Sequence, residues 1–219
     1  MEIFERITTQ ASAQGLMVMG ALHPARANAK TLDHGTLVLL GVGAAFWPHF
    51  QTQSEAQDGA PDPIDRWSIR VVTDLAKQIN ATAHFPFGGP PYAPFIDWAQ
   101  KSGRCFPSPT GMMVHDTVGL MISFRGALHL PDEHPIPVVN APSPCETCTT
   151  KPCTATCPVG ALGTVAPYDV PACHRFLKTP PGMDCMDHGC KVRRACPVSD
   201  GAGRKADQSA HHMRHFHRG

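Results

Sequence analysis

The first apolar pattern in the chain has the period of a helix. Ile3, Phe4, Ile7 and Ala11 recur at intervals that place them on one helical face. Gly15 follows, and glycine is common just after the last turn of a helix because it adopts the left-handed conformation without a steric penalty. We therefore predict a helix near the N-terminus that ends before Gly15.

A longer helical pattern begins at Pro63. Asp62 is a candidate N-cap, and Pro63 suits the first helical position because no backbone N–H is needed there. Five apolar residues follow at helical spacing: Ile64, Trp67, Val71, Leu75 and Ile79. A shorter helix is predicted over Pro94–Lys101, with three residues facing inward: Phe95, Trp98 and Ala99.

Short apolar runs bounded by turn-forming residues predict strands. Leu16–Leu22 and Thr36–Val42 each have the length of a buried strand. Met112–Leu130 predicts two strands, or one long strand that bends at Gly119 or Gly126. Together with the helices, these strands predict a mixed fold.

Three segments lack the pattern of regular structure. Pro48–Pro61 is rich in Gln, Ser, Asp and Gly, which predicts a solvated connection. Phe85–Pro91 combines Pro with paired Gly, which predicts a loop. Pro131–Pro144 contains five Pro, and this composition favours an extended linker. We place a domain boundary in this linker.

These segments predict an α+β fold in three parts. An α/β unit spans residues 1–135, a small second domain spans 140–200, and a polar tail spans 204–219. The tail contains four His near its end, which is more typical of a solvated tail than of a metal site: His211, His212, His215 and His217.

Charge and hydropathy exclude several classes of protein. The 219 residues carry 19 Lys and Arg against 18 Asp and Glu, a net charge of +1, so no extended basic face is available to bind nucleic acid. The longest apolar run, Gly35–Trp47, is shorter than the roughly 20 residues that span a bilayer. The acidic segment 1–6 does not resemble a secretory signal. We therefore expect a cytoplasmic protein without a membrane span.

The cysteines are concentrated in one part of the chain. Eight of the nine lie between Cys145 and Cys196, and only Cys105 precedes them. Because thiols stay reduced in the cytoplasm, such a cluster favours metal binding over disulfide formation. Cys105 stands apart beside Phe106, and we interpret it as a packed thiol.

The clustered cysteines form two consecutive motifs. The first has the spacing Cys-x2-Cys-x4-Cys-x3-Cys-Pro, from Cys145 through Cys148 and Cys153 to Cys157 and Pro158. This spacing is close to the ferredoxin run, in which three Cys hold one 4Fe–4S cluster and the fourth binds the other. The second motif has the spacing Cys-x11-Cys-x4-Cys-x5-Cys-Pro and consists of Cys173, Cys185, Cys190, Cys196 and Pro197.

The two Cys-Pro endings suggest that each motif lends its last Cys to the cluster of its neighbour. One predicted set of ligands is then Cys145, Cys148, Cys153 and Cys196, and the other is Cys157, Cys173, Cys185 and Cys190. Eight thiolates imply two 4Fe–4S clusters. Four cations lie within the ligand loops, where they offset the negative charge of the clusters or form a docking face: Lys151, Lys191, Arg193 and Arg194.

Residues 145–200 resemble the two-cluster ferredoxin domain of epoxyqueuosine reductase and related iron–sulfur reductases. The resemblance is carried by the segments Cys145–Cys148, Cys157–Leu162, Ala172–Leu177, Gly189–Cys190 and Ala195–Pro197. The segment 119–128, just upstream, is similar to the strand that precedes this domain in the family. The Cys148–Cys153 gap and the gaps between the last three Cys are longer than in the family.

In that family the N-terminal α/β domain binds cobalamin, so the resemblance implies a related fold and an altered cofactor cleft near Phe85–Tyr92. The acidic catalytic segment of the family is not found in this sequence, which argues against the same substrate reaction.

The sequence thus predicts an electron-transfer protein that relays single electrons between a redox partner protein and its two clusters. One alternative is an oxidoreductase, a cobalamin-dependent reductase related to the epoxyqueuosine enzyme. Another is a zinc-stabilised interaction module, in which His174 or His188 joins the thiolates. Arg125 lies within an apolar strand and requires a polar partner.

Overall fold

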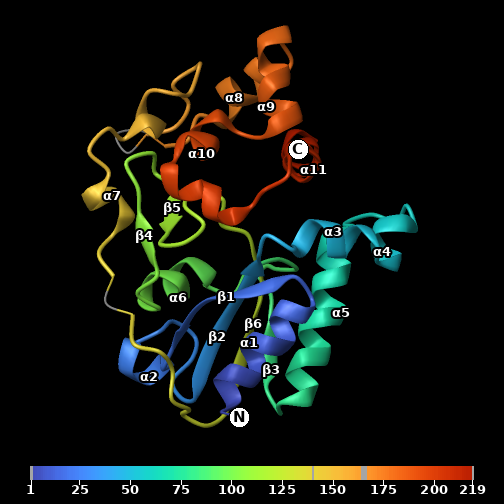
Figure 1. Cartoon of the computed structure of the whole chain (residues 1–219), viewed down its shortest axis with the longest axis vertical. Coiled ribbons are helices and arrows are strands. Elements are labelled where there is room, and N and C mark those ends of the chain that lie inside the picture. Colours follow the sequence, from blue (N-terminus) through green and yellow to red (C-terminus); the bar gives the residue numbers. More distant parts are fainter. Residues whose placement is uncertain (1, 140, 164–166, 219) are drawn as a thin grey trace. The chain divides into compact units, whose positions relative to one another are not determined.

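The computed structural model describes residues 2–139, 141–163 and 167–218 (Figure 1). The chain forms two compact units: the first comprises Met1–Cys105 and Ser123–Ala141, and the second comprises Phe106–Ile122 and Pro142–Gly219. Residues 106–122, which we predicted within the unit 1–135, belong to the second unit because Val114 and Leu120 pack against Val192 and Cys196. Among the described residues, no helix has the length and apolar character needed to cross a bilayer.

The first unit contains a four-stranded antiparallel sheet. Its order is β1 (Leu16–Leu22), β2 (Thr36–Val42), β6 (Phe124–Leu130) and β3 (Thr82–His84). The predicted bounds of β1 and β2 are confirmed. The mixed helix and strand content is confirmed as well, but antiparallel pairing makes this unit α+β and not the α/β unit of the prediction, since its strands are not joined by parallel crossovers.

Six helices accompany this sheet in the described part of the first unit: α1 (Ile3–Ala13), α2 (Pro24–Ala27), α3 (Phe46–Gln51), α4 (Ser54–Gln57), α5 (Pro63–Gln78) and α6 (Phe95–Lys101). The helices predicted before Gly15, from Pro63 and near Pro94 are confirmed. Asp62 occupies the predicted N-cap position, and its carbonyl oxygen accepts from the N–H of Arg66, but its backbone is left-handed with φ of 50° and its side chain makes no capping bond.

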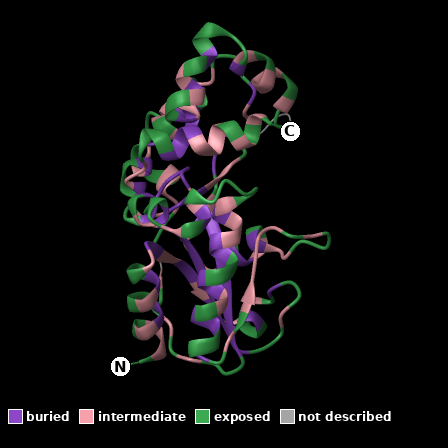
Figure 2. Cartoon of the chain, turned by 90° about the vertical axis from the view of Figure 1, so that its right-hand side faces the viewer, coloured by how far each residue is buried: buried purple, intermediate pink, exposed green. Residues whose placement is uncertain are grey.

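The core of this unit lies on both faces of β2, whose seven residues are all buried (Figure 2). Val38, Leu40 and Val42 belong to one cluster with residues of α1 and α5. Leu37 and Leu39 are equally buried and point to the opposite face, because successive side chains of a strand alternate. Burial on both faces explains why β2 is a continuous apolar run and does not alternate.

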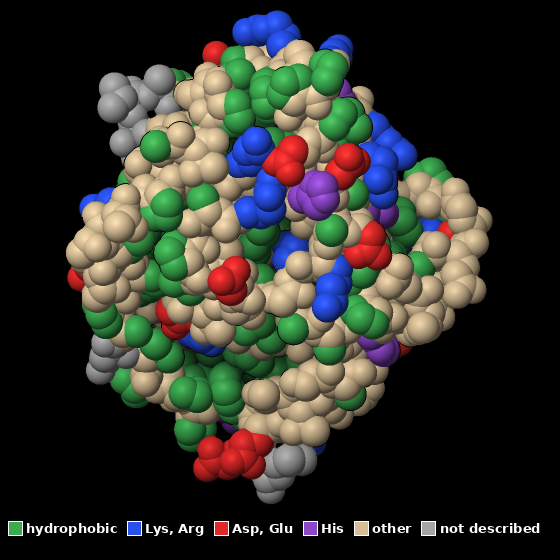
Figure 3. Space-filling model, turned by 45° about the horizontal axis from the view of Figure 1, so that its top comes forward, with side chains coloured by type: hydrophobic (Ala, Val, Ile, Leu, Met, Phe, Trp, Pro, Cys, Tyr) green, Lys and Arg blue, Asp and Glu red, His purple; other side chains and the backbone are tan. Residues whose placement is uncertain are grey.

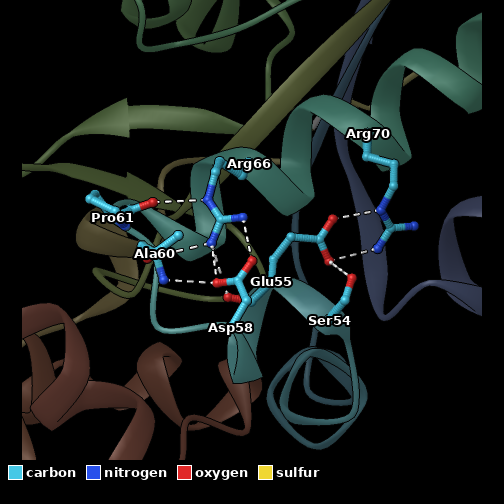
Figure 4. A network of polar contacts seen from close by, with 7 residues as sticks. All are labelled: Ser54, Glu55, Asp58, Ala60, Pro61, Arg66 and Arg70. Atoms are coloured by element: carbon cyan, nitrogen blue, oxygen red, sulfur yellow. Dashed lines mark hydrogen bonds and ion pairs between the residues drawn. The ribbon is translucent and has the colours of Figure 1, made fainter.

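The connection predicted at Pro48–Pro61 is wrong in part, because α3 extends to Gln51 and α4 lies within the segment. The Phe46 ring lies 5.1 Å from the Trp67 ring, so α3 is held by packing against α5. Glu55 on α4 accepts hydrogen bonds from Arg70 on α5, at 2.6 and 3.0 Å (Figure 4). Arg66 forms a second bidentate pair with Asp58.

The Glu55–Arg70 pair predicts a pH-dependent stability. Arg70 lowers the pKa of Glu55 to about 2, from an ordinary value near 4.5. A lowered carboxyl pKa stabilises the fold above pH 4.5, and this contribution is lost as the pH falls towards 2. Since Arg70 is partly exposed, we expect about 1–2 kcal/mol. Urea unfolding of Glu55→Gln should show its full deficit at pH 7 and a smaller one at pH 3, where the native carboxyl is still ionised but the unfolded one is mostly protonated; an equal deficit at both values would contradict the prediction.

The second unit consists of short helices around a two-stranded sheet, formed by β4 (Cys105–Pro107) and β5 (Met113–His115). The remaining elements are α7 (Pro144–Thr147), η1 (Pro152–Thr154), α8 (Val170–Leu177), η2 (Pro180–Gly182), α9 (Met183–His188), α10 (Lys191–Ala195), η3 (Pro197–Ala202) and α11 (Ala206–His217). The predicted polar tail at 204–219 is therefore mostly helix. Gln208, Ser209 and Ala210 of α11 are buried, which anchors the helix.

Candidate metal centre

The eight clustered cysteines occupy the ends of short helices in the second unit. Six lie in these helices or at their caps: Cys145 in α7, Cys148 after it, Cys153 in η1, Cys185 in α9, and Cys190 and Cys196 at the two ends of α10. Cys173 lies within α8, and Cys157 lies in the turn after η1. All nine cysteines of the chain are free thiols.

Four thiols interact as a first set: Cys145, Cys148, Cys153 and Cys196. Burial raises the pKa of Cys153, and repulsion by the other three thiolates of the set raises it further. Burial also raises the pKa of Cys145, to which the charges of Cys196 and Cys148 add. The four sulfurs therefore lie close enough for their charges to interact.

The other four thiols form a second set: Cys157, Cys173, Cys185 and Cys190. Burial raises the pKa of Cys173, and the charges of Cys190 and Cys157 raise it further. Burial raises the pKa of Cys185 as well, with Cys190 adding to the effect. The thiolates that raise each of these four pKa values belong to the same predicted set as the shifted thiol, and the assignment of each set to a cluster stays a prediction.

Apolar side chains surround these thiols. Val114, Leu120 and Val192 are each at most 1% exposed and form a cluster with Cys153 and Cys196. Residues of the 106–122 segment thus cover the thiols on one side. An apolar shell of this kind limits the access of water to a metal centre and influences its reduction potential.

Backbone N–H groups point at sulfur in both motifs. The N–H of Ala161 donates to the Sγ of Cys157 over 3.3 Å. The backbone of Lys191 bonds Cys185, which opposes the effect of burial on that thiol. Such donors stabilise thiolates, which are the form that binds metal.

One buried cation lies beside the second set. Arg193 donates through its Nη1 to the carbonyl oxygen of Leu120, and Cys190 acts on its charge. Burial lowers the pKa of Arg193, whereas the negative charge of Cys190 raises it. The neighbouring cations Lys191 and Arg194 pair instead with Asp184 on α9. Two cations of this loop therefore act on thiols of the second set, Arg193 on Cys190 and Lys191 on Cys185.

A site for a single metal ion requires closely grouped ligands. In the parts of the chain that the structure describes, no three His, Cys, Asp or Glu side chains are grouped to hold a single metal ion. A tetrahedral zinc site with Zn–S bonds of about 2.3 Å brings its sulfurs to about 3.8 Å from one another. In a 4Fe–4S cluster each thiolate binds a different iron, so the sulfurs are further apart. The assignment of these thiols to 4Fe–4S clusters stays a prediction.

The remaining sequence candidates lie in the first unit. Cys105 is 2% exposed, as a packed thiol would be. Arg125 forms an ion pair with Asp65 at 3.1 Å and lies 6.0 Å from the Phe87 ring, so its predicted polar partner is a carboxylate. Cobalamin binding near Phe85–Tyr92 stays a prediction. A cavity of about 540 Å³ lies elsewhere in this unit, lined by α2 and the loop 28–33.

Two features of this region leave no local signal in the sequence. Leu120 receives the Arg193 hydrogen bond although 73 residues separate them. Tyr168 lies beside Cys173 and donates a hydrogen bond to its sulfur. Comparison of the chain with protein-family models, curated proteins and solved structures finds no match.

Proposed function

We propose that this chain is an iron–sulfur electron-transfer protein with a ferredoxin-like second unit, as its resemblance to epoxyqueuosine reductase implies. The first thiol set would hold one 4Fe–4S cluster and the second set would hold another. The observation that carries the proposal is the gathering of eight free thiols in one compact unit, five of them in or against a single apolar cluster: Cys145, Cys153, Cys157, Cys190 and Cys196. Each cluster, when bound, accepts and returns one electron.

Single-electron transfer needs no bound substrate, and the residues of the second unit support this role. The thiols provide the ligands, the apolar residues around them exclude water, and the backbone donors and Arg193 offset negative charge. Two centres in one small unit would pass single electrons to and from a redox partner protein.

Anaerobic metal analysis tests the proposal. Protein purified without oxygen should be brown and contain about eight iron atoms and as much acid-labile sulfide, four of each for every thiol set. Colourless protein with about one zinc for every four thiols would support the interaction module and overturn the proposal.

Arg193 provides a prediction on the reduction potential. A cation near a centre favours its reduced, more negative form, so Arg193→Leu should lower the potential of the second set's cluster by something on the order of tens of millivolts. Arg193→Lys, which keeps the charge, should retain most of the original value. Redox titration followed by electron paramagnetic resonance measures both variants. If the Arg193→Leu and Arg193→Lys proteins had equal reduction potentials at equal iron content, the electrostatic role of Arg193 would be contradicted.

A further inference from the structure

Four rings of the second unit form a continuous surface, which we call the aromatic surface: Tyr168, His174, Phe216 and His217. The Tyr168 and Phe216 rings are stacked, with centroids 6.2 Å apart and planes 6° from parallel. The edge of His174 meets the Phe216 ring at 4.7 Å, and the His174 and His217 rings are 5.0 Å apart. The surface thus joins α8 to the end of α11.

This surface is open to solvent. Tyr168 is 41% exposed and Phe216 is 36% exposed, although both carry large apolar rings. Nε2 of His174 and Nδ1 of His217 are buried and find no hydrogen-bond partner among the described residues. A buried polar atom without a partner is energetically unfavourable. Exposed rings beside unsatisfied nitrogens are features of a binding surface.

The aromatic surface is connected to the second thiol set. His174 follows Cys173 directly in α8. An electron that arrives at the aromatic surface is therefore one residue away from a predicted iron ligand.

Charge indicates the kind of molecule that would dock here. The second unit contains ten Lys and Arg against seven Asp and Glu. Lys178 lies one helical turn after His174, and Arg214 lies one turn before His217, and both are exposed. Figure 3 looks onto the top of Figure 1, where Lys and Arg side chains lie among carboxylates. Imidazole N–H groups and cations both match carboxylates.

We propose that the aromatic surface is the docking site of an acidic one-electron carrier protein. This inference rests on the proposed function and adds the place and the charge of the partner. The carrier would lose one electron, and the iron held by the second thiol set would gain it, while no bond forms or breaks and no proton moves. Carboxylates of the carrier would face Lys178 and Arg214, with an apolar contact on Phe216.

The experiment uses the whole chain with its iron and an acidic plant-type 2Fe–2S ferredoxin as the probe. Stopped-flow absorption follows electron transfer from the reduced probe at low and at high salt. We expect a rate that falls with salt, and that falls by about tenfold or more in Arg214→Glu and in Phe216→Ala. Lys77→Glu reverses an exposed charge on α5 of the first unit and should leave the rate unchanged.

Two further measurements separate the possible failures. Carbodiimide cross-linking of probe carboxylates to lysines should give a one-to-one product that Lys178→Glu weakens and Lys77→Glu does not. Iron content and reduction by dithionite should be the same in every variant. Absence of iron in the parent protein would refute the proposed function. A normal iron content, together with electron-transfer rates that neither Arg214→Glu nor Phe216→Ala changes, would refute the docking site alone. Faster electron transfer with a basic carrier such as cytochrome c than with the acidic probe would refute it as well.

Discussion

Removing one thiol from either set should halve the iron of the protein. We expect the iron content of the Cys153→Ala protein to be about four atoms per chain instead of about eight, because a 4Fe–4S cluster needs four thiolates. The iron content of the Cys185→Ala protein should fall by the same amount, because that protein loses the other cluster. The two positions are well matched, since Cys153 is 8% exposed and Cys185 is 6% exposed, and alanine keeps an apolar side chain at each.

Cys105→Ala is the control for this prediction. This thiol is also buried but lies in the first unit, so its loss should leave the iron content at about eight. Iron and sulfide analysis of the three anaerobic proteins, with circular dichroism to verify folding, makes the measurement. A folded Cys153→Ala or Cys185→Ala protein with all of its iron, or with none, would show that the thiols do not act as two sets of four.

The sequence predicts the sheet of the first unit well because its signals are local. Leu16–Leu22 and Thr36–Val42 are apolar throughout and are bounded by residues that end strands, so their bounds do not depend on the rest of the chain. The helix α4 has a polar sequence and four residues. It is stabilised by Arg70, which lies 15 residues away from Glu55, and no pattern within the segment reveals this.

The same distinction applies to the candidate metal centre. The clustering of the cysteines in the sequence brings the eight thiols into one unit, because closely spaced residues lie near one another in any compact fold, while their division into two sets of ligands stays a prediction. The residues that cover the thiols leave no such local signal in the sequence. Leu120 comes from a segment that precedes the motifs, and it contacts Arg193 only after the chain has folded. The helix α11 has a polar, His-rich sequence, yet Ser209 and Ala210 are buried in the second unit.

The largest expected effect on stability lies at Trp67 in the first unit. This side chain is fully buried, and its ring lies 5.1 Å from that of Phe46 and 6.0 Å from that of Phe50. Trp67→Ala removes these contacts and leaves a cavity, so the free energy of unfolding of this unit should fall by about 3–5 kcal/mol. That is a large share of the roughly 5–15 kcal/mol by which most domains are stable.

Trp67→Phe separates the packing of the ring from its polar atom. The Nε1 of Trp67 is buried and has no hydrogen-bond partner among the described residues, so phenylalanine loses ring volume but also removes an unsatisfied donor. We expect a loss well below that of alanine, about 1 kcal/mol. Urea unfolding followed by tryptophan fluorescence reports on the first unit, since Trp47 and Trp98 also lie there. A Phe variant as unstable as the Ala variant would show that the indole N–H does bond, and that its hydrogen bond outweighs the packing.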